Sequence, residues 1–280
     1  MTLAYDPNSI FPYSPIVDRP PVKWPNEARV AVWVVPNIEH FHFDGFAPNG
    51  PDIRNYSRRD YGNRVGIWRL METLARHGMR GSVALNGEIG LYYPRIMEEA
   101  AKLGWEFMGH GMTNSQRLEG LPLEKEREII LQTRAIIEDH GQKMRGWLGP
   151  GLGETWSTLD LLREAGVDYV CDWVNDDLPY AMKNGIYSIP YSIEINDVPL
   201  FNMPSISIAD FEQRIRDAFD VLYEEGERGG RVLCIALHPF LIGSPHRIRY
   251  LDRALAYMAG HDKVWFATGS EIIDAFKAQA

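Results

Sequence analysis

The sequence predicts a single α/β domain built on a mainly parallel β-sheet. The chain has 280 residues, a common length for one large α/β domain, and 45% of them are apolar, enough for a sizeable core. Short apolar runs also alternate with amphipathic stretches about seven times, which is typical of parallel strands joined by right-handed helical crossovers. Both an open doubly wound sheet and a barrel satisfy this pattern.

The predicted strands are short runs rich in apolar and β-branched residues. In chain order they cover 29–36, 81–85, 105–109, 144–148, 167–171, 231–237 and 263–267. Residues 186–204 are expected to form a further β excursion, and residues 40–60 a loop. No Gly-x-Gly-x-x-Gly pattern follows the first strand, so a dinucleotide-binding fold lacks support.

The predicted helices are amphipathic, and several end at a glycine, the residue that most readily takes the left-handed conformation after a helix. Gly78, Gly104, Gly141 and Gly166 occupy such positions, and Pro122 begins the longest helix. The helices cover 64–77, 88–103, 122–140, 156–165, 208–226, 246–259 and 269–278.

The proline content, net charge and cysteine count exclude several classes of protein and binding partner. Residues 1–28 are rich in proline and are expected to form an extended arm over the domain 29–280, or over a neighbouring subunit. The net charge is −9 without any run of Lys or Arg, so neither nucleic acid nor an anionic membrane is an expected partner. Two cysteines exclude a disulfide framework and a cysteine-based zinc site. No signal sequence or apolar run of ~18 residues is visible, which predicts a cytoplasmic protein.

Polar side chains follow several of the predicted strands, where α/β folds place their chemistry. Those that follow the strands directly are Asn37, Glu39, His40, His42, Asp44, His110, Asn114, Asp172, Asn175, Asp176, Asp177 and His238. His110 and His238 are the strongest candidates, because each comes immediately after a strand.

Two site designs compete for these residues. His40 and His42 lie two positions apart, so they share one face of an extended chain and could bind a metal; the pair is similar to the two-histidine motif of the amidohydrolase superfamily. That superfamily also needs an Asp after the last strand, where this chain has Gly269, Ser270 and Glu271. The missing partners make this design the weaker one.

The second design resembles the NodB-type polysaccharide deacetylases over residues 29–270. The residues that carry the resemblance occur in a fixed order: Glu39, His110 with Asn114 four positions on, the turn 146–151, and His238 between Leu237 and Pro239. The resemblance implies a deformed (β/α) barrel of about seven strands, in which residues 29–280 form the catalytic domain.

The sequence departs from the metal-dependent pattern of that family at three positions. Asn37 stands where the resemblance implies a catalytic Asp, Glu39 where it implies a ligand Asp, and Asn114 where it implies a second ligand His. A neutral amide is a poor zinc ligand. The chain is therefore more similar to the metal-independent branch, which contains cofactor-free allantoinase and cyclic imide hydrolases. The stretches 60–69 and 176–180 are also similar to segments of that branch. The resemblance further implies a homotetramer.

We expect a small cyclic amide or imide as substrate, since its ring nitrogen leaves more readily than that of an acetamide. Glu39 would act as general base, with a raised pKa if its pocket is apolar, His238 as proton donor, and the amides of Gly151 and Leu152 as oxyanion hole. Glu39 and His238 could also exchange roles. His110 is the third catalytic residue, and the residues expected to contact water or substrate are Asn37, Arg64, Asn114, Trp147, Asp177 and Tyr191.

No cofactor is expected, and a weak zinc site of Glu39, His110 and Asn114 is the alternative that the residues leave open. Three other functions compete with ring opening by an imidase: allantoinase activity, metal-dependent deacetylation of an acetylated amino sugar, and ligand binding without catalysis.

Overall fold

The computed structural model describes residues 6, 8–44, 50–202 and 206–279, so residues 1–5 and 7 of the expected arm lie outside the described residues. Within them, nine strands form one sheet in the order β6-β7-β5-β4-β3-β2-β1-β8, and β9 pairs with β1. The strands are β1 (Val30–Ile38), β2 (Ser82–Leu85), β3 (Glu106–Gly109), β4 (Gly146–Trp147), β5 (Tyr169–Val170), β6 (Tyr180–Ala181), β7 (Tyr187–Ser188), β8 (Arg231–Leu237) and β9 (Val264–Phe266). All neighbours pair in parallel except β6 and β7.

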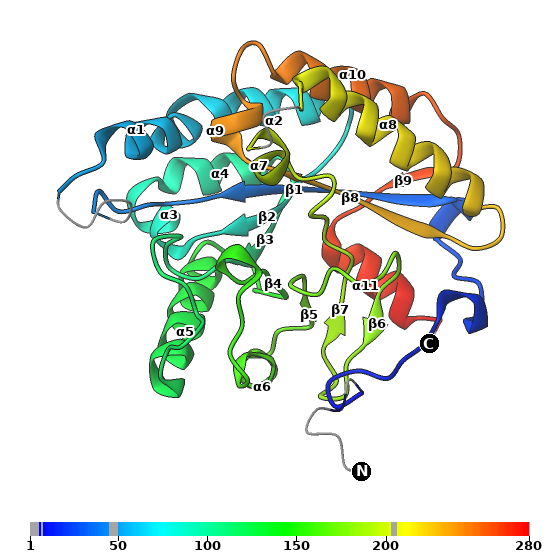
Figure 1. Cartoon of the computed structure of the whole chain (residues 1–280), viewed down its shortest axis with the longest axis horizontal. Helices are drawn as coiled ribbons and strands as arrows, with labels where there is room; N and C mark the ends of the chain where they lie inside the picture. Colours follow the sequence, from blue (N-terminus) through cyan, green and yellow to red (C-terminus); the bar gives the residue numbers. More distant parts are fainter. Residues whose placement is uncertain (1–5, 7, 45–49, 203–205, 280) are drawn as a thin grey trace.

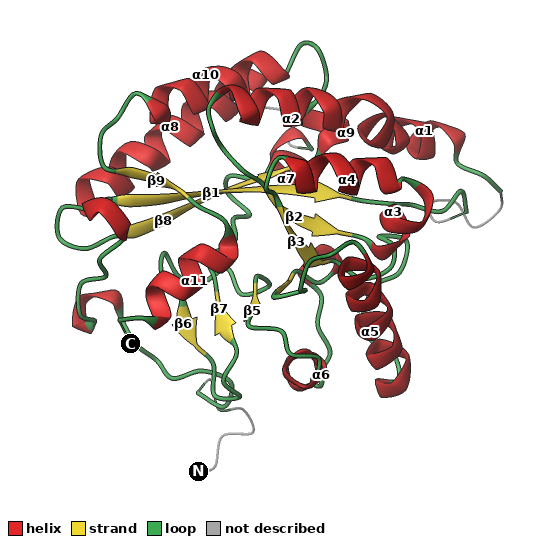
Figure 2. Cartoon of the chain, turned by 180° about the vertical axis from the view of Figure 1, so that it is seen from behind, coloured by secondary structure: helices red, strands yellow, loops and turns green. Residues whose placement is uncertain are grey.

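Helices surround this curled sheet in Figure 1. They are α1 (Ile53–Tyr61), a π-helical turn (Gly62–Gly66), α2 (Ile67–Arg76), α3 (Gly87–Tyr92), α4 (Pro94–Lys102), α5 (Leu123–Asp139), α6 (Thr158–Glu164), α7 (Asp197–Phe201), α8 (Ile208–Glu225), α9 (Pro239–Ile242), α10 (Ile248–Ala259) and α11 (Gly269–Lys277). Figure 2 shows from behind that α11 lies in front of β5–β7, far from α1 and α2. This arrangement confirms the predicted α/β fold, a deformed barrel in one domain.

Strand β1 is the central strand of the barrel, because three strands pair with it. It pairs with β8 from Val30, opposite Arg231, to Pro36, opposite Leu237. Its other edge is shared: β9 pairs with its first three residues, and β2 with its last two. Every residue of β1 is buried, so its run of β-branched side chains packs on both faces, as expected of a central parallel strand.

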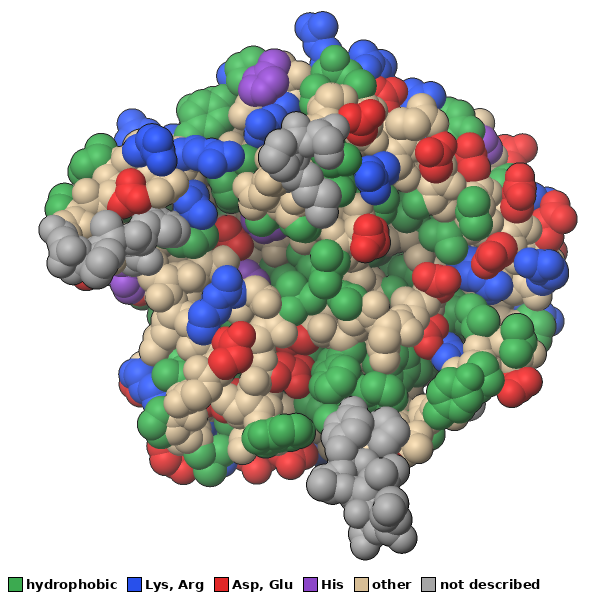
Figure 3. Space-filling view, viewed as in Figure 1, with side chains coloured by type: hydrophobic (Ala, Val, Ile, Leu, Met, Phe, Trp, Pro, Cys, Tyr) green, Lys and Arg blue, Asp and Glu red, His purple; other side chains and the backbone are tan. Residues whose placement is uncertain are grey.

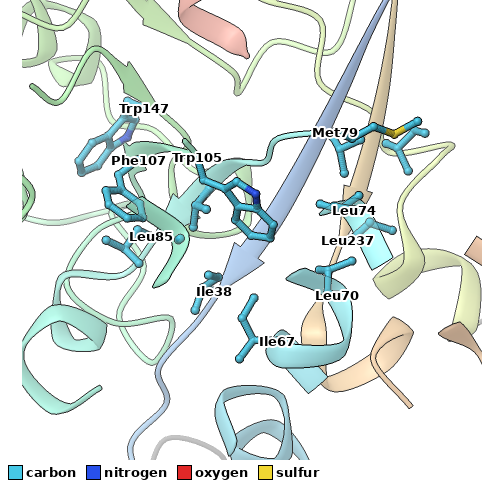
Figure 4. Close-up of a cluster of buried hydrophobic side chains, with 14 of the residues drawn as sticks. Ile38, Ile67, Leu70, Leu74, Met79, Leu85, Trp105, Phe107, Trp147 and Leu237 are labelled. Atoms are coloured by element: carbon cyan, nitrogen blue, oxygen red, sulfur yellow. The ribbon is translucent and has the colours of Figure 1, made fainter. Parts of the chain in front are cut away.

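Two hydrophobic clusters fill the space inside and outside the sheet. Figure 4 shows part of the larger one, where Ile67, Leu70 and Leu74 of α2 pack toward β1 and Trp105 and Phe107 lie near β3. Ile67, Leu70 and Leu74 follow the spacing of one helix face, which explains why this stretch folds as an amphipathic helix on the sheet.

The structure corrects two of the predicted segments. Residues 40–60 are not all loop, since α1 begins at Ile53, with the Asp52 side chain accepting a hydrogen bond from the Asn55 backbone N–H. In the described part of the expected β excursion 186–204, which is 186–202, the structure has only the two-residue strand β7 and then the short helix α7; residues 203 and 204 lie outside the described residues. A helix of five residues is too short to show the period on which the prediction relied.

The proline-rich arm packs on the same chain. The ring of Phe11 meets Trp173 and Tyr180 edge-on, and Arg19 forms an ion pair with Asp176 at 2.6 Å. Farther along, the indole N–H of Trp24 donates to the Arg231 carbonyl. The arm from Phe11 onward therefore runs along the β5–β7 side of the barrel toward the beginning of β8.

Candidate active site

The ends of β1, β3 and β8 are aligned by the sheet register, which brings three ionisable side chains together. Asn37 lies opposite Ala84, and Leu85 opposite Gly109, so β1, β2 and β3 end at one level. Glu39, His110 and His238 follow these ends, and all three side chains are buried. One Glu39 oxygen, Oε1, lies 3.7 Å from His110 Nε2 and 3.5 Å from His238 Nε2. The three residues predicted to be catalytic thus form one cluster.

Figure 3 shows a hollow near the centre of the face that it draws, with acidic and histidine side chains visible in it. The Glu39 side chain is only 8% exposed, so charges at its carboxylate are poorly screened by solvent.

His238 is oriented by a carboxylate that the sequence analysis did not include. Asp197, fully buried at the first position of α7, accepts a hydrogen bond from His238 Nδ1 at 2.7 Å and another from the His238 backbone N–H at 2.9 Å. With Nδ1–H donating to Asp197, the other ring nitrogen points at Glu39. A sequence signal existed: Asn196 and Asp197, with Pro199 shortly after, form a helix-start pattern within an apolar stretch.

His110 is fixed in a different way. Its Nδ1 hydrogen-bonds the Leu148 carbonyl at 2.6 Å, so Nδ1 carries the hydrogen and Nε2 offers a lone pair when the ring is neutral. Nε2 is buried and has no hydrogen-bond partner among the described residues. A buried polar atom without a partner is rare, and here it marks the place where water or substrate would be held.

The charges of these groups depend on one another. Burial alone would raise the pKa of Glu39, but the nearby imidazoles of His238 and His110 outweigh it and lower the pKa to about 2. Burial alone would lower the pKa of His238, yet Glu39 and Asp197 raise it to about 10. At neutral pH the cluster therefore holds a Glu39 carboxylate beside a His238 imidazolium. The raised pKa expected for Glu39 depends on an apolar pocket; the pocket contains two imidazoles, so this condition is not met and the pKa is lowered instead.

Two amides complete the cluster. The Asn114 side chain donates from Nδ2 to Glu39 Oε1, while its Oδ1 accepts from Asn86 Nδ2 at 3.3 Å. Two residues before Glu39, in β1, Asn37 is buried and donates to the Tyr191 hydroxyl at 3.1 Å and to the Leu237 carbonyl at 3.3 Å. Asn37 thus links β1 to the end of β8 and to Tyr191.

These residues do not fit the divalent metal that catalytic Asp-His-His sites of this kind would hold. Asn114 turns its N–H toward the carboxylate, and the opposite orientation would place its oxygen against Glu39 and its N–H₂ against that of Asn86. Among the described residues, Glu39 and His110 are then the only two suitable donors at this position, since His238 is protonated at neutral pH and its Nδ1 is held by Asp197. In the described part of the chain, three donor atoms converge within 4.8 Å of one another in only one group, His40, His42 and Glu88, which is a different place.

Three residues expected to bind substrate lie elsewhere. Arg64 is 74% exposed in the π-helical turn and points to Asp60 at 3.8 Å, whereas the nearby Arg59 interacts electrostatically with Glu39. Trp147 is fully buried in the hydrophobic core. The Asp177 carbonyl accepts from the Val232 N–H at the beginning of β8, about 20 Å of extended chain from His238.

The predicted oxyanion hole is also incorrect in part. Gly151 and Leu152 do form a tight turn, with φ angles of 66° and 59°. However, the Leu152 N–H donates to the Gly149 carbonyl at 2.8 Å, and the Gly149 N–H donates to Asp172 at 2.7 Å. The Leu152 amide is used inside the turn and is not free for an oxyanion, and the Arg117 guanidinium lies against Gly151.

Comparison with known proteins agrees with this geometry. The sequence model of the family "Polysaccharide deacetylase" matches residues 56–170. A polysaccharide deacetylase-type protein of Schizosaccharomyces pombe is 28% identical over 91% of this chain and 92% of its own length. Two crystal structures superpose with a TM-score of 0.84 each: an allantoinase, 27% identical over 93% of this chain and 94% of that one, and a polysaccharide deacetylase-type protein of Pseudomonas aeruginosa PAO1, 29% identical over 94% and 95%.

The family match and the allantoinase neighbour support a hydrolase of carbon–nitrogen bonds other than peptide bonds. The resemblance to the polysaccharide deacetylase family seen in the sequence is confirmed by the family model over residues 56–170 and by the two crystal structures. No helix among the described residues is long and apolar enough to cross a membrane.

Proposed function

We propose that this protein opens the ring of a small cyclic amide, imide or ureide by hydrolysis, without a catalytic metal. The observation that carries the proposal is the Asn114 amide donating to Glu39, in a cluster where Glu39 and His238 already form a carboxylate–imidazolium pair. A cluster with its own proton donor and acceptor suits a substrate whose leaving nitrogen is stabilised by a second carbonyl. An acetamide lacks that help and usually needs a Lewis acid.

The reaction would begin with water held between Glu39 and the unpaired Nε2 of His110. Its oxygen attacks a ring carbonyl while one proton moves to Glu39, giving a tetrahedral intermediate. The carbon–nitrogen bond then breaks, and His238 gives its Nε2 proton to the departing nitrogen. The proton on Glu39 returns to His238, whose Nε2 lies 3.5 Å from Oε1, so the products are a carboxylic acid and an open amide.

The low pKa of Glu39 is compatible with its role as acceptor. That low value depends on the positive charge of His238. As His238 donates its proton, the charge disappears and Glu39 becomes more basic, so the two transfers favour each other. Asp197 keeps His238 oriented throughout. The structural similarity to an allantoinase supports the choice of a ring substrate.

A second candidate is metal-dependent deacetylation of an acetylated amino sugar, favoured by relatives whose names denote polysaccharide or peptidoglycan deacetylases. A substrate panel separates the two. We expect the purified protein, with a chelator present, to open succinimide, maleimide, hydantoin or allantoin and to leave acetylated chitooligosaccharides intact, as followed by NMR. Release of acetate that depends on added zinc, with every ring untouched, is the result that favours the deacetylase. An absence of turnover with all compounds would favour a binding protein.

The assembly and the location of the protein stay predictions. We propose a cytoplasmic homotetramer, to which the arm that carries Phe11 could contribute. Light scattering of the purified chain, with and without residues 1–28, tests the subunit count.

A further inference from the structure

Three side chains beside the catalytic cluster, but not part of it, converge on one point. His40 Nδ1 lies 2.6 Å from Glu88 Oε2, and His42 Nε2 lies 2.9 and 3.0 Å from the two oxygens of the same carboxylate. All three donor atoms lie within 4.8 Å of one another. This is the histidine pair seen in the sequence, now with a third partner that sequence spacing alone could not supply.

Backbone hydrogen bonds hold both halves of this cluster in place. The His40 N–H donates to Asn86 Oδ1 at 2.9 Å, and the His42 N–H to Ser115 Oγ at 2.8 Å. Glu88 lies in the first turn of α3, where its own N–H donates to the Met112 carbonyl at 3.0 Å. The His40 ring also packs 5.2 Å from the ring of Tyr92. The donors are therefore pre-positioned rather than displayed on free side chains.

We propose that His40, His42 and Glu88 bind a divalent transition-metal ion of the zinc type. Two imidazoles and one carboxylate are a common protein ligand set for such ions. With bonds of roughly 2.0–2.2 Å, an ion separates its ligands by about 3.3 Å. The two His–Glu pairs, at 2.6 and 2.9 Å, would therefore open by less than ~1 Å, and the two histidine nitrogens, which lie within 4.8 Å of each other, would approach by no more than about 1.5 Å. His42 is 45% exposed, and His40 and His42 line a cavity of about 840 Å³ together with Phe43, Tyr56 and Tyr93. The remaining coordination positions would face this cavity and take water or an anionic ligand.

The site is separate from the position of the family's metal. Glu39 faces His110 and His238, whereas its neighbour His40 faces Glu88. The two are linked through the backbone: the His40 carbonyl accepts from the Asn114 N–H at 2.9 Å, and the Asn114 side chain donates to Glu39. An ion at His40 would stiffen the segment that positions Glu39 without touching substrate.

Equilibrium dialysis of the full chain against zinc, together with the visible absorption of the cobalt-loaded protein, tests the site. We expect one equivalent of metal, and affinities lowered more than about 100-fold in His42→Ala and Glu88→Gln, beyond the upper end of what the loss of an outer-shell partner costs. His246→Ala, which removes an exposed histidine elsewhere, and Glu39→Gln should bind as the wild type does.

Two results would overturn the proposal. One is a wild-type protein that binds no more metal than His42→Ala; the three residues would then be a hydrogen-bonded group only. The other is loss of metal in Glu39→Gln with retention in His42→Ala, which would place the ion at the family's position and also contradict catalysis without a metal. Circular dichroism checks that the variants are folded. The risk of misfolding is small, because His42 is half exposed and the Glu88→Gln change is isosteric.

Discussion

The Asp197 carboxylate accepts two hydrogen bonds from His238, one from Nδ1 at 2.7 Å and one, with its other oxygen, from the backbone N–H at 2.9 Å. These hydrogen bonds fix the position of the ring, and they determine that Nδ1 carries a hydrogen. It also connects α7 to the end of β8, two elements 41 residues apart in the chain. The reactivity of His238 toward Glu39 therefore depends on a residue that touches neither water nor substrate.

Replacing Asp197 with Asn tests this relationship. The isosteric amide removes a negative charge that raises the pKa of His238, so the alkaline limb of the kcat profile should move to lower pH. We expect kcat to fall by about 10²–10⁴, the range for an impaired general acid, with a much smaller effect on KM. A pH profile with the wild-type limb would show that Asp197 has only a structural role.

Activity should fall at high pH and hold at neutral pH. His238 must be protonated and Glu39 ionised, and their pKa values are about 10 and about 2. The rate is therefore expected to be flat around neutrality and to decline as the pH approaches 10, as measured by kcat in overlapping buffers. A rate that rises through pH 6–8 would show instead that a neutral histidine is needed.

The pKa shifts of His238 and Glu39 also predict how the stability of the fold varies with pH. The pKa of His238 is raised in the folded state from 6.5, so its contribution is fully present below pH 6.5 and is lost as the pH rises through about 10. The pKa of Glu39 is lowered from 4.5, so its contribution is present above pH 4.5 and is lost as the pH falls through about 2. Thermal unfolding of His238→Gln should show a smaller loss of Tm than the wild type between pH 7 and 10.

Glycine is required at position 66 by close packing against the turn after His238. A Cβ built there would lie 2.0 Å from the Pro239 carbonyl oxygen, which belongs to backbone and cannot move aside alone. Gly66→Ala should lower the free energy of unfolding by about 1–3 kcal/mol, the usual cost of overpacking, and should also reduce kcat by displacing His238. Gly260→Ala is the matched control, because its Cβ would meet nothing closer than 3.4 Å. Equal denaturation midpoints for the two variants would contradict this packing.

Arg64 and Asp177 should be dispensable. Both lie outside the cluster, so Arg64→Ala and Asp177→Asn are expected to change kcat/KM by no more than about twofold, the scale of ordinary surface changes. A tenfold loss in either variant would mean that substrate reaches much farther from His238 than the site geometry implies.

Most of the fold and the centre of the site could be predicted from the sequence. Glu39, His110 and His238 could be found because each follows a strand, and parallel strands end at one edge. Asp197 was missed because α7 is too short for periodicity, and Glu88 because its approach to His40 depends on tertiary packing. The direction of the Glu39 pKa shift depends on distances to two imidazoles, which no sequence pattern supplies.

Catalysis without a metal is tested most directly in the His42→Ala variant after exhaustive dialysis against a chelator, since this protein should retain no ion at either position. We predict that its kcat on the best ring substrate is within about twofold of the wild type and is unchanged by added zinc, whereas Glu39→Gln treated in the same way is inactive. Turnover that is absent after dialysis and returns in proportion to added zinc, with Glu39, His110 and Asn114 as its ligands, would contradict the account.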